Sequence, residues 1–161
     1  ITMATYCGQN LGAKKFDRIE KGVHRGVALA FGYAAIGFCV ARFLGPYLSL
    51  LFIDGSETEV IALAQQYINA GSYFYLILSL LFVLRNALQG LGYSFTAMLT
   101  GMFELVARGI MGFGFVNTIG YAAACIANPI AWIAADLFLI PAYIIVSRKV
   151  KRSLSSRISE E

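Results

Sequence analysis

The sequence predicts an all-α protein that spans a membrane as a bundle of about four helices, preceded by the end of a further helix. Hydrophobic residues make up 58% of the 161 residues and charged residues only 14%, with a mean hydropathy of +0.69. A soluble domain of this length cannot cover so much apolar side chain. Several stretches also reach the roughly 20 apolar residues that a helix needs to cross a hydrocarbon core about 30 Å thick.

We expect one membrane domain over residues 1–161. Residues 1–12 are typical of the end of a helix, and residues 13–22 of a basic loop. The four membrane helices and the tail that follows them are predicted at 23–44, 57–90, 95–115, 121–147 and 148–161.

The first two spans have clear starts. The first carries no charged residue between Arg25 and Arg42. The second follows Ser56-x-x-Glu59, the pattern of a capping box at a helix N-terminus. Its first half is amphipathic and its second half is almost wholly apolar, up to Gly90, where glycines should end it.

The last two spans are separated by the stretch NTIG at 117–120, which should end the third one. The fourth contains Pro129 and Pro141, where we expect a bend or a locally unwound turn, because proline lacks the amide that a helix uses. Alanine recurs in it at every fourth position, a spacing that lets helices in lipid approach closely. These residues are Ala123, Ala127, Ala131 and Ala135.

Basic residues lie before the first span and after the last one. They are Lys14, Lys15, Arg18, Lys21 and Arg25, and then Arg148, Lys149, Lys151, Arg152 and Arg157. Four spans place both groups on one side, which the positive-inside rule makes cytoplasmic. We therefore expect a multi-pass protein of the plasma (inner) membrane, with the basic loop and the C-terminus in the cytoplasm. Because these cations flank spans, a nucleic-acid partner is not expected.

Residues that carry catalysis or bind metals are scarce. His24 is the only histidine, and the three cysteines are widely spaced in apolar sequence, which is typical of small buried side chains. The stretch GQNLGAKKFDR at 8–18 is not a phosphate loop, because only three residues separate its glycines and Lys15 stands where a hydroxyl should bind magnesium. The sequence predicts no enzyme, no catalytic residue, no metal site and no cofactor.

Four charged residues lie inside the predicted spans, where each costs about 2.5–3.5 kcal/mol on insertion scales. They are Arg85, Glu104, Arg108 and Asp136. The helix rise places them roughly 8–20 Å from the cytoplasmic ends of their spans. We predict that they form a formally neutral polar cluster that joins the last three spans. Two roles remain open: the charges pair and fix helix register, or Glu104 or Asp136 takes up and releases a proton or a cation.

An ordered set of motifs resembles the multidrug and toxic compound extrusion (MATE) family. In sequence order these are Gly8-Gln9-Asn10-x-Gly12-Ala13, Leu51-Phe52 with Asp54 and Glu57-x-Glu59-Val60-Ile61, Leu88-Gln89-Gly90-x-Gly92, and Glu104-Leu105-x-x-Arg108. The resemblance implies that residues 1–12 end helix eight and that the spans are helices nine to twelve of a twelve-helix transporter. The missing N-terminal helices of that transporter would be partners, besides the lipid bilayer. The glycines of the first motif are expected to permit a tight turn between helices.

The same resemblance implies a secondary active multidrug efflux transporter working by alternating access. It would export small cationic or amphipathic molecules, with H+ (or Na+) as the coupling ion. NorM-like members use an acid in helix ten, but here Leu78 lies near that position, which favours the proton-coupled, DinF-like branch. The side chains expected to line the cavity are Asn69, Tyr73, Tyr75, Asn86 and Gln89.

Three other functions are weighed against drug efflux. A lipid-linked oligosaccharide flippase of the same superfamily would need a larger and more cationic cavity. An intramembrane enzyme using Glu104 or Asp136 as an acid or base would need a second catalytic group at the same depth. A structural four-helix membrane protein remains if the 161 residues are the whole natural chain.

Overall fold

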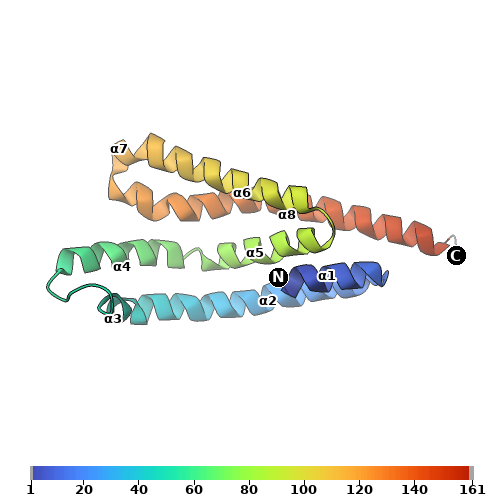
Figure 1. The fold of residues 1–161 in the computed structure, drawn as a ribbon, viewed down its shortest axis with the longest axis horizontal. Coiled ribbons are helices and arrows are strands. Elements are labelled where there is room, and N and C mark those ends of the chain that lie inside the picture. Colours follow the sequence, from blue (N-terminus) through green and yellow to red (C-terminus); the bar gives the residue numbers. More distant parts are fainter. Residues whose placement is uncertain (1, 160–161) are drawn as a thin grey trace.

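The computed structural model describes residues 2–159, and the side chains of residues 2–154, as helical segments with no strand among them. The all-α prediction is confirmed. The segments are α1 (Thr2–Gly12), α2 (Phe16–Cys39), η1 (Val40–Leu44), α3 (Gly45–Ser49), α4 (Thr58–Ser72), α5 (Tyr75–Gly90), α6 (Ser94–Gly109), η2 (Ile110–Phe115), α7 (Val116–Ile119) and α8 (Tyr121–Ser159). Figure 1 shows them as an elongated bundle.

Helix α5 lies at the centre of the bundle, in contact with α1, α2, α6 and α8 (Figure 1). It supplies much of the buried core through Leu81, Leu84 and Leu88. Helix α8 packs on α6, and Ala131 and Ala135 of the predicted alanine seam are fully buried.

Three helical stretches are long and apolar enough to cross a membrane: residues 16–49, 94–119 and 121–154. A fourth span results if the bent pair α4 and α5 is counted as one. Large apolar side chains on these helices face outward, such as Leu29 at 77% exposed and Phe113 at 90%. Exposed apolar surface of this extent requires lipid or further helices to cover it.

The second predicted span is not one straight helix. It ends at Ser72 and restarts at Tyr75, with a bend of 54° between α4 and α5. Gly71 and Ser72 precede the bend, and the Ser72 hydroxyl donates to the carbonyl of Asn69 at 2.9 Å, which competes with the helix backbone.

The predicted capping box is also wrong. The hydroxyl of Ser56 donates to Oδ1 of Asp54 at 2.9 Å, and the helix begins after Glu57 without a side-chain cap. The hydroxyl and the backbone amide of Ser56 both donate to the carboxylate of Asp54. The serine therefore stabilises the preceding turn and not the first turn of α4.

The last helix differs from its prediction as well. Helix α8 runs without interruption from Tyr121 to Ser159, through Pro129 and Pro141. Pro129 is fully buried, so packing holds the helix together where its backbone lacks a hydrogen bond. The predicted tail is helical as far as Ser159, and residues 160–161 lie outside the described part of the chain.

Most of the predicted basic loop is helical too, because α2 begins at Phe16. The turn before it uses no glycine. Lys14 adopts the left-handed conformation with φ 54°, and the amide of Lys15 bonds the carbonyl of Asn10 at 2.9 Å while that of Lys14 bonds Leu11 at 3.0 Å. These two bonds form a Schellman motif, with Lys14 in the position that glycine usually takes. The expectation that glycines make this turn is therefore wrong.

Gly8, the first glycine of the first sequence motif, instead lies where α1 contacts α5. A methyl group added at Gly8 would lie 3.4 Å from the carbonyl oxygen of Gly90, whereas one added at Gly12 would meet nothing within 4 Å. Gly90 is tighter, since a methyl there would lie 2.3 Å from the carbonyl oxygen of Ala4. Helices α1 and α5 thus touch backbone to backbone at the point where the two motifs meet.

Candidate functional site

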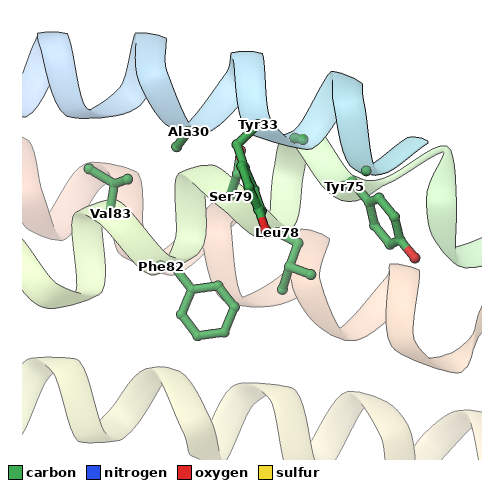
Figure 2. A pocket seen from close by; sticks show the side chains of 9 residues that line it. Ala30, Tyr33, Tyr75, Leu78, Ser79, Phe82 and Val83 are labelled. Atoms are coloured by element: carbon green, nitrogen blue, oxygen red, sulfur yellow. The ribbon is translucent and has the colours of Figure 1, made fainter. Parts of the chain in front are cut away.

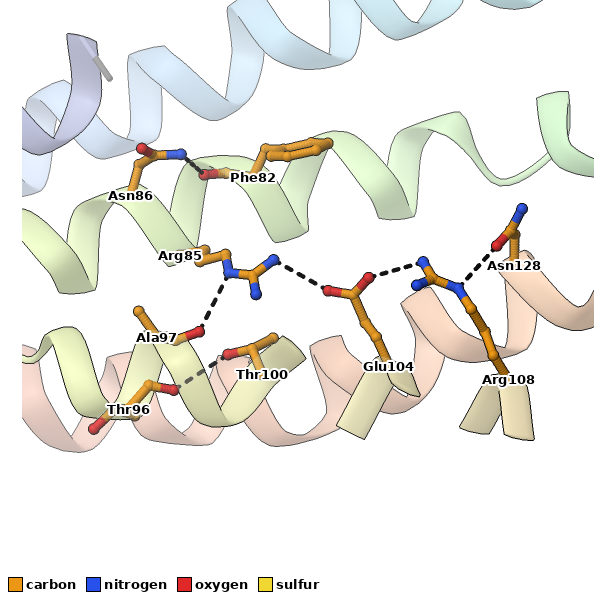
Figure 3. Close-up of polar contacts among 9 residues, drawn as sticks. All are labelled: Phe82, Arg85, Asn86, Thr96, Ala97, Thr100, Glu104, Arg108 and Asn128. Carbon is orange, nitrogen blue, oxygen red and sulfur yellow. Dashed lines mark hydrogen bonds and ion pairs between the residues drawn. The ribbon is translucent and has the colours of Figure 1, made fainter. Parts of the chain in front are cut away.

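An ion-pair network connects α5 and α6 in the middle of the bundle (Figure 3). Nη1 of Arg85 lies 3.1 Å from Oε1 of Glu104, and Nη2 of Arg108 lies 3.0 Å from Oε2 of the same residue. Each carboxylate oxygen therefore faces one guanidinium group. The Glu104 side chain is only 12% exposed, whereas the side chains of Arg85 and Arg108 are 27% and 43% exposed. The carboxylate is the buried member of both pairs, so removing a guanidinium partner would leave a largely buried charge less well compensated and would lower stability.

The network continues to α8 and α4. Nε of Arg108 donates to Oδ1 of Asn128 at 2.9 Å (Figure 3), and Nδ2 of Asn128 donates to the hydroxyl of Tyr67 at 2.6 Å. On the other side, Nε of Arg85 donates to the carbonyl of Ala97 at 3.2 Å. Four helices are thereby joined by one chain of polar contacts.

Sequence reasoning missed Asn128 and Tyr67 as members of this network. An asparagine inside an otherwise apolar span was the available signal, since an amide there needs partners. The bend predicted beside it rests on Pro129 alone and gives the amide of Asn128 no role.

Small residues of α6 leave room for the guanidinium of Arg85. A methyl group added at Gly101 would lie 2.8 Å from its Nη2 atom. Thr100 beside it is fully buried, with its hydroxyl bonded to the carbonyl of Thr96 at 3.3 Å. The face of α6 toward α5 thus leaves space for a charged side chain at Gly101.

Asp136 behaves differently from the other three charges. It is 6% exposed, and neither of its carboxylate oxygens has a hydrogen-bond partner among the described residues. Of the four charges predicted to form one polar cluster, Arg85, Glu104 and Arg108 are therefore connected, and Asp136 makes no hydrogen bond among the described residues. A buried charge without a partner costs free energy unless it is paired or neutralised.

An apolar hollow lies between α2 and α5 (Figure 2). Its lining residues are Ala30, Tyr33, Ala34, Gly37, Tyr75, Leu78, Ser79, Phe82 and Val83. The two tyrosines and Phe82 present aromatic rings there, and no charged side chain lines it among the described residues. Leu78, an apolar side chain, is among the residues that line this hollow.

Of the five side chains predicted to line a cavity, Tyr75 alone lines this hollow. Tyr73 packs its ring on Phe38 at 5.5 Å between centroids, and it is 64% exposed. Asn69 accepts a hydrogen bond from Gln65 at 2.9 Å.

Further along α5, Asn86 donates to the carbonyl of Phe82 at 2.8 Å (Figure 3), and Gln89 is exposed. The polar candidates are therefore not gathered around the hollow in the described chain.

The five residues of the first motif all lie at the end of α1 and in the turn after it. Asn10 donates to the carbonyl of Tyr6 at 2.9 Å, and the carbonyl of Gln9 accepts from the amide of Ala13 at 3.0 Å. These contacts shape the helix end. Among the described residues no group of three or more His, Cys, Asp and Glu side chains is placed to hold a metal ion.

The fold and these sites define a polytopic membrane protein with a polar network buried among its helices. The model of the MatE family matches residues 1–114, and the chain belongs to that family, which places it in the MATE transporter superfamily. No curated protein and no solved structure matches this chain. The matched range ends within η2, so Asn128 and Asp136 of α8 lie beyond it.

Proposed function

We propose that this chain works in a secondary active multidrug efflux transporter, which exports organic cations or amphipathic drugs in exchange for protons by alternating access. Membership of the MATE transporter superfamily supports the general class. The observation that carries the coupling part of the proposal is Asp136, a buried carboxyl with no hydrogen-bond partner among the described residues. We place the membrane at the cell surface, with both basic ends of the chain in the cytoplasm.

The proposal assigns different tasks to the two buried acids. Glu104 already has one guanidinium at each oxygen, so its charge is compensated and its role is to hold α5 against α6. Asp136 has no such partner, and a proton or a cation would neutralise it. A carboxyl that exchanges its proton as the bundle changes conformation would link substrate export to proton entry.

The apolar hollow between α2 and α5 is our proposal for part of the drug site. Tyr33 and Tyr75 line it from different helices, with Phe82 beside them (Figure 2). Aromatic faces attract flat cations by about 0.5–2 kcal/mol each. The site would therefore prefer aromatic cations to small hydrophilic ones.

A drug-efflux assay on the intact protein that contains this sequence tests the proposal. Cells expressing Asp136→Asn should keep normal amounts of folded protein but lose most of the efflux of an aromatic cation. Glu104→Gln removes one charge from the network and should lower the amount of folded protein by disturbing both ion pairs. Normal efflux by the Asp136→Asn protein would refute the coupling role.

A further inference from the structure

The start of α2 lies beside the part of α8 that runs toward its end (Figure 1). Cations from three segments line one hollow there. This hollow, called the basic hollow below, is lined by Lys14, Lys15, Phe16, Asp17, Arg18, Lys151 and Leu154. Among the described residues that line it, Asp17 is the one acid against four cations. The hollow thus combines a strong positive charge with the apolar side chains of Phe16 and Leu154.

Contacts between the elements hold the Lys151 side chain and the start of α2 in place. Nζ of Lys151 lies 5.7 Å from the ring centroid of Phe16 and 3.8 Å from Oε2 of Glu20. The hydroxyl of Tyr6 donates to the carbonyl of Arg18 at 2.9 Å, which ties the first turn of α2 to α1. Together with the Schellman turn at Lys14, these contacts build a concave surface from three parts of the chain.

A second hollow adjoins the first, because Phe16 and Lys151 line both. This membrane-side hollow is lined in addition by Glu20, His24, Tyr143, Ile144, Ser147 and Arg148. Tyr143 and Ile144 belong to the membrane-spanning part of α8. The two hollows therefore lead from a cationic end to the apolar surface of a span.

We propose that the two hollows form a binding site for an acidic phospholipid. Its phosphate would lie in the basic hollow, and its glycerol and the first part of an acyl chain would lie in the membrane-side hollow. Basic residues beside a span attract anionic headgroups by about 1 kcal/mol each. A free phosphate ion could use the same cations, but it would gain nothing from the apolar surface next to them.

Native mass spectrometry of the intact, detergent-purified protein tests this proposal. Phosphatidylglycerol and phosphatidylcholine are offered at equal concentrations, and inorganic phosphate is added as a competitor. The protein should retain phosphatidylglycerol and not phosphatidylcholine, and phosphate at the lipid's concentration should not displace it. Equal retention of the two lipids, or displacement by phosphate, would overturn the proposal without any variant being needed.

Two matched double variants then locate the site. Lys15→Gln with Arg18→Gln should weaken phosphatidylglycerol binding about thirtyfold, the change that corresponds to about 1 kcal/mol for each cation. Lys21→Gln with Arg152→Gln removes the same charge from exposed positions that line neither hollow, and should leave binding unchanged. Equal weakening by both pairs would show that general surface charge, and not this site, attracts the lipid.

Discussion

Replacing Gly90 by alanine tests whether the two glycine motifs meet as a helix contact. The added methyl would lie 2.3 Å from the carbonyl oxygen of Ala4 and 2.8 Å from Cβ of Cys7, where ordinary contact begins at 3.4 Å. Helix α1 must then move by about 1 Å away from a well-packed core. Overpacking of this size costs up to about 3 kcal/mol. Alanine regains about 1 kcal/mol of helix propensity, which leaves a net loss of about 2 kcal/mol.

Thermal unfolding of the intact protein in detergent measures this loss. At roughly 2–4 °C per kcal/mol for a chain of this size, the melting temperature should fall by about 4–8 °C. Gly12→Ala is the matched control, because a methyl there meets nothing within 4 Å. It should leave the melting temperature unchanged or raise it slightly. If Gly90→Ala melts like the wild type, the two helices do not touch as described and the reasoning fails.

Three further predictions concern single residues. Lys14→Gly should stabilise the protein by about 1 kcal/mol, because it removes a left-handed lysine; a lower melting temperature would contradict this. The amide and the hydroxyl of Ser56 hold the pKa of Asp54 below its usual range, so Ser56→Ala should raise that pKa. A lowered pKa means that the ionised carboxylate of Asp54 stabilises the turn at pH values above the pKa of the unfolded chain. This stabilisation should be lost as the pH falls through the lowered pKa. NMR titration of the Asp54 carboxyl and of the turn amides checks both statements. Asn128→Ala should cost about 0.5–1.5 kcal/mol in thermal unfolding by removing one acceptor of Arg108, and an unchanged melt would place that contact outside the stabilising network.

The spans could be predicted from the sequence because lipid imposes one simple requirement, a long apolar helix, on every crossing. The bend between α4 and α5 could not be predicted, because glycine and serine, which stand at 71 and 72, are also common in straight membrane helices. Pro129 was expected to interrupt its span, but burial of its ring against neighbouring helices keeps α8 continuous. Local sequence patterns show where a helix can bend or unwind, whereas packing against neighbouring helices decides whether it does.

The candidate site, too, could be predicted from the sequence only in part. Glu104 and Arg108 are four residues apart and therefore share a helix face, and the structure pairs them. The estimated depths predict a cluster that includes Arg85, and the structure pairs Arg85 with Glu104. Depth could not reveal that Asn128 would accept a hydrogen bond from Nε of Arg108, or that Asp136 would have no partner among the described residues, since both depend on how α8 is rotated.

Proton release on substrate binding tests the proposed coupling role of Asp136 most directly. The intact protein in detergent is mixed with the aromatic cation ethidium, and binding heats are measured in buffers of different ionisation enthalpy. If the carboxyl of Asp136 exchanges its proton for substrate, the wild type should release about one proton per bound cation and Asp136→Asn about none. Equal release by both proteins would mean that the proton comes from another group, and the assignment of coupling to Asp136 would be wrong.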